Sequence, residues 1–205
     1  MKTRWLQRDG ADALILVFGG WALGAAPFAH LGGAADVLLL SDYRSLDFDL
    51  EPLRPYARRS LIAYSFGVAT AGHALASGEL NFGRKVAICG SLNPADEHLG
   101  IPPERVRQTA DQLTETSLRQ FARRAGSPLP EASDIPALRD ELHAVIARGP
   151  APDPGFDRIW LGRNDRVFLP ENLEAAWRMQ TDRVRWLEAG HNPFAAFIDW
   201  RDLLA

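Results

Sequence analysis

The sequence predicts an α/β fold in which helices cover a mostly parallel sheet. Two observations lead to this prediction. Short apolar segments alternate with helical segments along the chain, and most of the apolar segments are continuous rather than alternating. Continuous apolar segments are typical of strands that are buried on both faces, as they are in parallel sheets. A chain of 205 residues is long enough to bury the core of one such domain.

The individual elements follow from the same patterns. Six strands are expected where short apolar segments occur, at residues 13–18, 36–40, 61–64, 85–89, 157–161 and 182–187. An antiparallel edge strand is expected within residues 1–7. Helices are expected where helical patterns follow the strands, at residues 68–77, 170–179 and 194–204.

Residues 93–155 interrupt this alternation. They contain two helical stretches, at about 103–124 and 135–148, with prolines and glycines at their ends and no strand pattern. The chain is therefore expected to consist of a first core part (1–92), a helical insertion (93–155) and a second core part (156–205). Insertions that follow the carboxyl end of a strand lie above the ligand crevice in such sheets. The insertion is therefore expected to act as a lid.

Composition narrows the classes of function. The net charge of −3 gives no general reason to expect nucleic acid binding. A single cysteine, Cys89, excludes an internal disulfide and suits a reducing compartment. The basic start and the apolar segment after it resemble a secretory signal, but Asp9 and Asp12 interrupt the basic region and Gly19 ends the apolar segment. No segment is long and apolar enough to span a membrane. We expect a cytoplasmic monomer.

Ser65 occupies the sequence pattern of a nucleophile elbow. An apolar strand pattern ends at Tyr64, and a helix pattern of small residues begins directly after the serine. In such a strand–turn–helix the backbone beside the serine is tightly packed, so the positions two before and two after it must be small. Those positions are Ala63 and Gly67, so alanine replaces the usual first glycine. The pattern is short and occurs often by chance, so it needs support from the rest of the chain.

An acid and a histidine follow in the order that such a serine requires. A serine hydroxyl needs a base to take its proton. In three-layer hydrolases the acid and then the histidine lie on loops after later strands. Asp165 follows the strand expected at 157–161, and His191 follows the one expected at 182–187. Alone, Asp165 could close a turn and His191 could precede a helix at the surface. Their joint placement favours a Ser65–His191–Asp165 triad.

The oxyanion hole of such a site would consist of two backbone N–H groups. One belongs to the residue after the nucleophile, Phe66, and the other to a loop after an early strand. Gly19-Gly20-Trp21 is that loop, and the Trp21 N–H is the expected donor. A Gly-Gly-Trp turn could also be purely structural. The rings of Trp21, Tyr64 and Phe66 would line an apolar acyl pocket.

Sequence patterns for cofactor and metal binding are absent. No Gly-x-Gly-x-x-Gly follows a strand, and no Gly-Lys-Ser/Thr loop is present. His-Glu-x-x-His and similar metal-binding spacings are absent as well. We therefore expect neither a cofactor nor a metal. Cys89 ends an apolar run and is interpreted as a buried small residue.

With these residues in hand, the chain resembles the BioG-type pimeloyl-acyl carrier protein methyl ester esterases of biotin synthesis, within the α/β-hydrolases. The shared motifs extend over nearly the whole chain, at residues 18–21, 41–44, 64–67, 100–103, 121–124, 164–166 and 191–194, with Trp200 beyond. The chain departs from the family pattern at Gly19, where a polar residue is common, and at Cys89-Gly90-Ser91, where Asn-Gly is usual.

The resemblance implies hydrolysis of a methyl ester at the far end of a seven-carbon acyl chain carried by acyl carrier protein, an acidic partner. Five arginines of the insertion would suit docking of that partner, namely Arg105, Arg107, Arg119, Arg123 and Arg124. Without the resemblance, a solvated helix face explains these arginines better. Two alternatives to this function remain open. One is a general short-acyl carboxylesterase or thioesterase, and the other is a catalytically silent hydrolase fold that binds a carrier protein.

Overall fold

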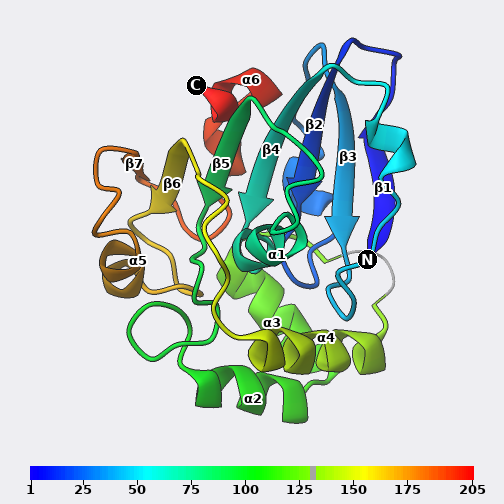
Figure 1. The fold of residues 1–205 in the computed structure, drawn as a ribbon. Coiled ribbons are helices and arrows are strands. Elements are labelled where there is room, and N and C mark those ends of the chain that lie inside the picture. Colours follow the sequence, from blue (N-terminus) through cyan, green and yellow to red (C-terminus); the bar gives the residue numbers. More distant parts are fainter. Residues whose placement is uncertain (130–132) are drawn as a thin grey trace.

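Seven strands form one sheet in the order β1-β3-β2-β4-β5-β6-β7 (Figure 1). The computed structural model describes residues 1–129 and 133–205. β1 pairs antiparallel with β3, and every other neighbouring pair of this sheet is parallel. The strands are β1 (Lys2–Gln7), β2 (Ala13–Phe18), β3 (Asp36–Ser41), β4 (Arg58–Tyr64), β5 (Arg84–Ile88), β6 (Arg158–Gly162) and β7 (Val184–Leu187). The predicted α/β-hydrolase fold with an antiparallel edge strand is confirmed.

Helices cover the sheet sparsely. α1 (Gly67–Ala74) lies on one face and α6 (Trp200–Leu204) on the opposite face, as Figure 1 shows. α5 (Pro170–Ala176) packs beside β6. The connections after β2 and β3 contain only single 3-10 turns, at Ala26–Phe28 and Glu51–Leu53. Loops rather than long helices therefore pack against the sheet at these places.

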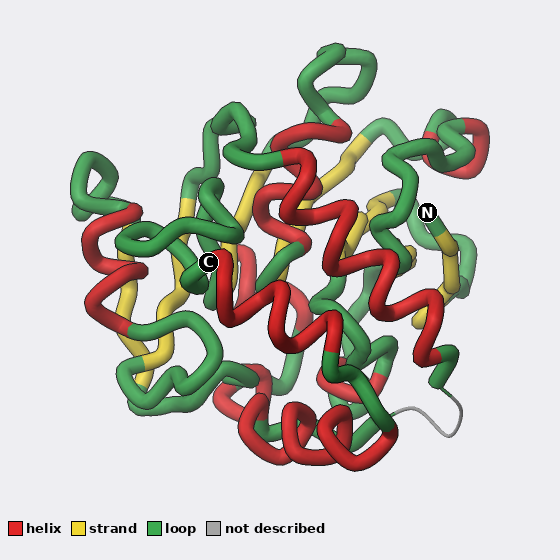
Figure 2. The backbone as a smooth tube through the Cα atoms, turned by 90° about the horizontal axis from the view of Figure 1, so that it is seen from below, coloured by secondary structure: helices red, strands yellow, loops and turns green. Residues whose placement is uncertain are grey.

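The helical insertion lies across the carboxyl ends of the parallel strands. It contains α2 (Pro103–Asp111), α3 (Glu115–Ala125) and α4 (Ile135–Arg148), and α2 packs against α4. Figure 1 places these helices below the arrowheads of β2–β4, and Figure 2 shows helices crossing the strand ends from below. Within the described residues, no helix is long and apolar enough to cross a membrane.

Two predicted helices are each divided in two, so these predictions were wrong in detail. The helix predicted at 103–124 breaks before Thr114, which adopts an extended backbone and caps α3 by accepting the Ser117 N–H. The helix predicted at 194–204 is a 3-10 turn, Phe194–Ala196, followed by α6, which Asp199 caps in the same way. In both cases a side chain capable of N-capping starts a new helix.

The other element boundaries lie within about three residues of the predictions. β4 begins at Arg58 instead of residue 61, because residues 58–60 continue the parallel ladder with Ala13–Ile15 of β2 despite their polar side chains. β5 ends at Ile88 and excludes Cys89, whose φ of 43° leaves the extended region. Local apolar patterning does not detect either effect.

Candidate active site

Ser65 stands at the turn between β4 and α1. Its backbone has φ 58°, a left-handed conformation that non-glycine residues seldom adopt. The Ser65 N–H donates to the Ile88 carbonyl at 2.9 Å, and the Ser65 carbonyl accepts from the Val68 N–H at 3.0 Å. A Cβ on Gly67 would lie 2.3 Å from the Phe18 carbonyl oxygen, so only glycine fits there. The sharp turn of a nucleophile elbow is therefore present, with Ala63 fully buried inside it.

The structure brings Ser65, His191 and Asp165 together. His191 Nε2 lies 3.0 Å from Ser65 Oγ, and His191 Nδ1 lies 2.8 Å from Asp165 Oδ2. The His191 and Asp165 side chains are fully buried, and Ser65 is 4% exposed. With Nδ1–H donating to the carboxylate, Nε2 is free to accept the serine proton.

Two loops position the acid and the histidine. Asp165 Oδ1 accepts the backbone N–H groups of Val167 at 2.7 Å and Phe168 at 3.0 Å, which orients Oδ2 toward His191. The two loops pack so closely that a Cβ on Gly162 would lie 2.4 Å from the Gly190 carbonyl oxygen. The carboxylate is therefore held by the backbone of its own turn.

Aromatic rings enclose the imidazole of His191. The Tyr64 ring lies 5.1 Å from it, and the Phe168 ring stacks on it at 6.0 Å with an interplanar angle of 13°. Tyr64 is fully buried and packs on His191 and Phe194, so its predicted place in an acyl pocket is wrong. The reason is strand alternation: because Ser65 turns outward after Tyr64, the Tyr64 side chain stays beneath the histidine.

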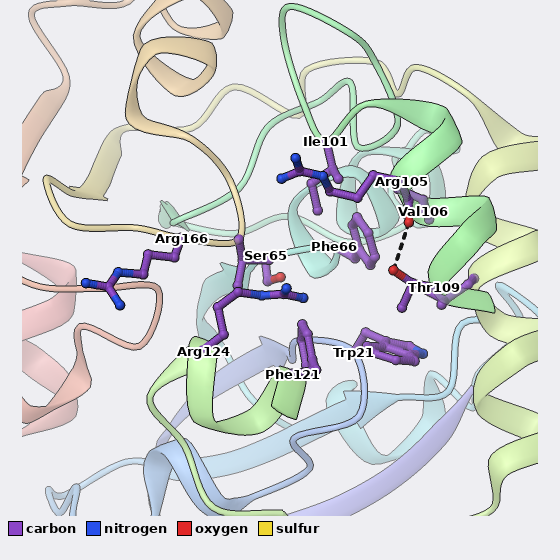
Figure 3. A pocket seen from close by; sticks show the side chains of 12 residues that line it. Trp21, Ser65, Phe66, Ile101, Arg105, Val106, Thr109, Phe121, Arg124 and Arg166 are labelled. Carbon is purple, nitrogen blue, oxygen red and sulfur yellow. Dashed lines mark hydrogen bonds between the residues drawn. The ribbon is translucent and has the colours of Figure 1, made fainter. Parts of the chain in front are cut away.

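A pocket opens beside Ser65 between the core and the insertion (Figure 3). The core supplies Trp21, Phe66 and Val167, and the insertion supplies mostly apolar side chains from all three of its helices. The lining residues from the insertion are Ile101, Arg105, Val106, Thr109, Phe121, Arg124 and Leu142. The Trp21 and Phe121 rings meet edge to face at 4.8 Å. The floor of the pocket is therefore apolar.

Arginines surround the pocket. Figure 3 shows the guanidinium groups of Arg105 and Arg124 reaching across it, whereas Arg166 points away from Ser65. The Arg124 guanidinium carbon lies 5.9 Å from the centre of the Phe121 ring. The pocket thus combines an apolar floor with a cationic rim.

The five arginines of the predicted docking patch differ in their surroundings. Arg107 pairs with Glu104 at 3.7 Å and Arg119 pairs with Glu115 at 3.5 Å, both on exposed helix faces. Among the described residues, Arg105, Arg123 and Arg124 make no salt bridge. The unpaired positive charge of the patch is therefore concentrated at and beside the pocket rim.

The Gly19-Gly20-Trp21 loop lies directly against the elbow. A Cβ on Gly20 would lie 3.3 Å from the Ser65 Cβ, so the glycine allows the loop to approach the nucleophile. Among the described residues, the backbone N–H groups of Trp21 and Phe66 donate to no other group. The Trp21 indole N–H donates to the Leu138 carbonyl of α4 at 2.9 Å, so the backbone N–H is the donor left for a ligand.

Two buried residues near this loop were given no role from the sequence, although Tyr43 lies in the shared motif at residues 41–44. Tyr43 is fully buried and donates its hydroxyl to the Gly19 carbonyl at 2.7 Å. Glu141 of α4 is 4% exposed, and burial raises its pKa to about 7, although the Tyr43 backbone N–H opposes this rise. One signal was available for Glu141, which stands at helical spacing between apolar Leu138 and Val145. Within residues 1–129 and 133–205, no group of acidic, histidine and cysteine side chains could hold a metal ion.

Comparisons with known proteins agree with this geometry. The BioG family of pimeloyl-ACP methyl esterases matches residues 1–147. The crystal structure of BioG from Haemophilus influenzae is similar over the full length of both chains, with 28% identity and a TM-score of 0.89. A lipase-esterase related protein from Clostridium acetobutylicum shares the fold, with 12% identity, a TM-score of 0.63, and 93% of this chain and 92% of that chain covered.

A longer relative also matches. The chain is 32% identical over 191 residues to a malonyl-[acyl-carrier protein] O-methyltransferase from Bacteroides fragilis. The match covers 86% of this chain but only 39% of that protein. The chain therefore spans about two fifths of the relative's length, and the methyltransferase name describes the longer protein.

Proposed function

The chain belongs to the BioG family of pimeloyl-ACP methyl esterases, and we propose that it hydrolyses the methyl ester of pimeloyl-acyl carrier protein in biotin synthesis. The products are methanol and pimeloyl-acyl carrier protein. The observation that carries the proposal is the buried, hydrogen-bonded Ser65–His191–Asp165 network beside an apolar pocket. The α/β-hydrolase fold alone would not distinguish among esters, because this fold supports many functions.

The three side chains supply the chemistry of acyl transfer. His191 Nε2 takes the Ser65 proton as the hydroxyl oxygen attacks the ester carbonyl, and Asp165 stabilises the resulting imidazolium. His191 then gives the proton to the departing methoxide, so methanol leaves and an acyl-serine ester remains. A water molecule, deprotonated by His191 in turn, attacks that ester. The acid is released and Ser65 regains its proton.

The negative charge on the attacked carbonyl oxygen needs fixed donors. The Phe66 and Trp21 N–H groups are proposed for this role, because both flank Ser65 and both lack an acceptor among the described residues. Loss of one such donor typically slows turnover by about 10²–10³-fold. The two loops therefore supply a large part of the proposed rate acceleration.

The pocket suits a chain of methylene groups. Its lining is apolar next to Ser65, so burial of each methylene contributes about 0.8 kcal/mol. The apolar side chains of Val106, Phe121 and Leu142 are proposed to line the path of the methylene chain, and Arg105 and Arg124 are proposed to lie at its entrance.

The cationic rim suits an acidic carrier protein. Arg105, Arg123 and Arg124 are proposed as the main contacts, because no acidic side chain of the described residues neutralises them. Arg107 and Arg119 are proposed as outer contacts that exchange their own helix partners for acids of the carrier. Such charges mainly raise the association rate and lose effect as salt is added.

The first test identifies the bond that is broken. Wild-type protein should release methanol from carrier-bound methyl pimelate and leave the thioester intact. Ser65→Ala should release none while keeping the wild-type circular dichroism spectrum. A free thiol in place of methanol would identify a thioesterase. Failure of a fluorophosphonate to label Ser65 would instead support the silent, carrier-binding alternative.

The second test separates carrier recognition from ester chemistry. Reversing the charge of Arg105, Arg123 and Arg124 to glutamate should lower kcat/KM for the carrier-bound ester at least tenfold and more strongly at low salt. The same variant should retain most of its activity on a short p-nitrophenyl ester. Arg54→Glu, at an exposed site in the β3–β4 connection, is the matched control. Equal losses on both substrates would exclude docking at this rim.

A further inference from the structure

We propose that Tyr43 is a positioning residue for the esterase reaction. Its hydroxyl holds the loop that carries the Trp21 N–H, and α4 of the insertion holds Tyr43 in turn. This inference rests on the function proposed above and adds to it a link between the insertion and the oxyanion hole. The link consists of hydrogen bonds between segments that are far apart in the sequence.

The loop is tied to its surroundings at three points. The Gly19 N–H donates to the Leu40 carbonyl at 3.0 Å, and the Gly19 carbonyl accepts from the Tyr43 hydroxyl at 2.7 Å. The Trp21 indole N–H donates to Leu138 at 2.9 Å. The hydroxyl also lies 3.2 Å from the Leu40 carbonyl, but its single proton favours the shorter contact. Tyr43 therefore fixes the peptide plane that directly precedes the one bearing the Trp21 N–H.

A strained turn delivers Tyr43 to this position. Asp42 adopts a left-handed backbone with φ 63°, which costs about 1 kcal/mol or more in a non-glycine residue. Two hydrogen bonds from Arg44, both at 2.7 Å, and a contact with Lys2 at 3.3 Å hold its carboxylate. The Arg44 hydrogen bonds lower the Asp42 pKa to about 2, so the carboxylate stays charged and keeps the turn closed.

α4 holds the backbone of Tyr43 from the other side. Arg148 donates to the Tyr43 carbonyl, and the Tyr43 backbone N–H faces the buried carboxyl group of Glu141. Leu138, one helical turn before Glu141, accepts the Trp21 indole. α4 therefore contacts both Trp21, at the end of the loop, and Tyr43, which binds Gly19 at the start of the loop.

A cavity behind the loop explains why this restraint is needed. The cavity has a volume of about 170 Å³, and Gly20, Ala22, Asp42, Leu138 and Glu141 contribute to its wall. Packing against Tyr64 and Ser65 restrains Gly20 on one side, but Gly20 also borders this cavity. The hydrogen bonds of Tyr43 and Trp21 therefore add restraint where packing is incomplete.

Loss of the Tyr43 hydroxyl would affect turnover more than binding. Hydrogen bonds weaken steeply as their angles fall, so a tilted Trp21 N–H loses most of its effect on the oxyanion. The substrate carbonyl needs that donor most when it becomes charged. The expected signature is a lower kcat with an unchanged KM.

The test compares two tyrosine-to-phenylalanine variants. Tyr43→Phe should lower kcat for methanol release by about tenfold to a hundredfold with KM within about twofold. Tyr56→Phe is the matched control, since its hydroxyl donates to the Asp36 carboxylate at 2.6 Å at the far end of β3. Tyr56→Phe should leave kcat unchanged. Wild-type kcat in Tyr43→Phe, or the same loss in both variants, would overturn the proposal.

A second pair keeps the proposal testable if Tyr43→Phe does not fold. Glu141→Ala removes the acceptor that faces the Tyr43 N–H, and it should lower kcat in the same way. Glu141→Gln keeps an oxygen acceptor and should restore most of the lost turnover. Equal kcat values for the two Glu141 variants would count against the link through α4.

The rate of Ser65 phosphonylation separates this proposal from the proposed function. A fluorophosphonate needs the same oxyanion donors but no carrier-bound ester. If wild-type protein released no methanol yet its Ser65 reacted with the probe, the proposed substrate would be wrong. Slower phosphonylation of Ser65 in Tyr43→Phe would then still support the Tyr43 proposal, and an unchanged rate would overturn it.

Discussion

Replacing Glu141 with glutamine should stabilise the protein at alkaline pH and change its stability little in acid. Glu141 is 4% exposed, and no salt bridge within the described residues neutralises its carboxylate. Its neighbours are the Tyr43 N–H and the charged groups of Asp42, Arg44, Lys2 and Arg148. The Tyr43 N–H, Arg44 and Lys2 favour the charged carboxylate, but burial outweighs them and raises the pKa of Glu141 from 4.5 to about 7. Ionisation of Glu141 therefore lowers the free energy of unfolding.

The sign and size of the effect follow from linkage. The folded state holds the Glu141 proton up to a higher pH than the unfolded state, so stability falls as the pH rises from 4.5 to about 7 and then levels off. A shift of this size corresponds to about 3 kcal/mol, at about 1.4 kcal/mol for each pH unit. Glutamine mimics the neutral acid, so it avoids this cost at every pH.

Urea unfolding at pH 5 and pH 8 measures the effect. The free energy of unfolding of Glu141→Gln minus that of the wild type should be about 2–3 kcal/mol larger at pH 8 than at pH 5. Glu79→Gln, at an exposed position, is the control and should show the same difference at both pH values. If the difference in the free energy of unfolding between Glu141→Gln and the wild type did not change with pH, the reasoning would be refuted. The carboxyl group would then be hydrated through the cavity that Gly20 and Asp42 also line.

Two further predictions concern the triad and the elbow. Asp165→Asn should lower kcat by about 10⁴-fold with little loss of stability, because the amide cannot keep His191 in the tautomer that accepts the Ser65 proton; a loss below tenfold in a steady-state methanol assay would contradict that role. Gly67→Ala should destabilise the protein by about 1–3 kcal/mol, because its Cβ would lie 2.3 Å from a backbone oxygen. Gly83→Ala, whose nearest contact would be 3.9 Å, should be close to neutral in the same thermal unfolding experiment.

The sequence predicted the sheet and the order of the triad because both depend on local patterns. Most of the strands contain a continuous apolar segment, and Ser65, Asp165 and His191 each follow a strand. The helix breaks also had local signals, because Thr114 and Asp199 are N-cap residues at the new helix starts. These breaks were missed because apolar periodicity continued across them.

The support around the oxyanion loop could not be predicted in the same way. The Tyr43 hydroxyl meets Gly19, and the Trp21 indole meets Leu138, 117 positions further along the chain. A hydrogen bond of this kind depends on where two loops and a helix pack, and no spacing in the sequence encodes it. The placement of Tyr64 failed for a different reason, because Ser65 turns outward after it and leaves the Tyr64 side chain against His191.

Residues with a strained backbone gather at the carboxyl ends of the parallel strands, where the proposed reaction takes place. The non-glycine residues with positive φ among the described residues are Ala22, Asp42, Ser65 and Cys89, which follow β2, β3, β4 and β5. Four adjacent strands thus end in connections that carry a residue in an unfavourable conformation, and each costs roughly 1–3 kcal/mol. Such conformations persist only where the surrounding structure enforces them. Here the enforcing contacts are those that hold the serine, the Trp21 loop and Tyr43, so stability is given up at the same edge where the proposed reaction requires fixed geometry.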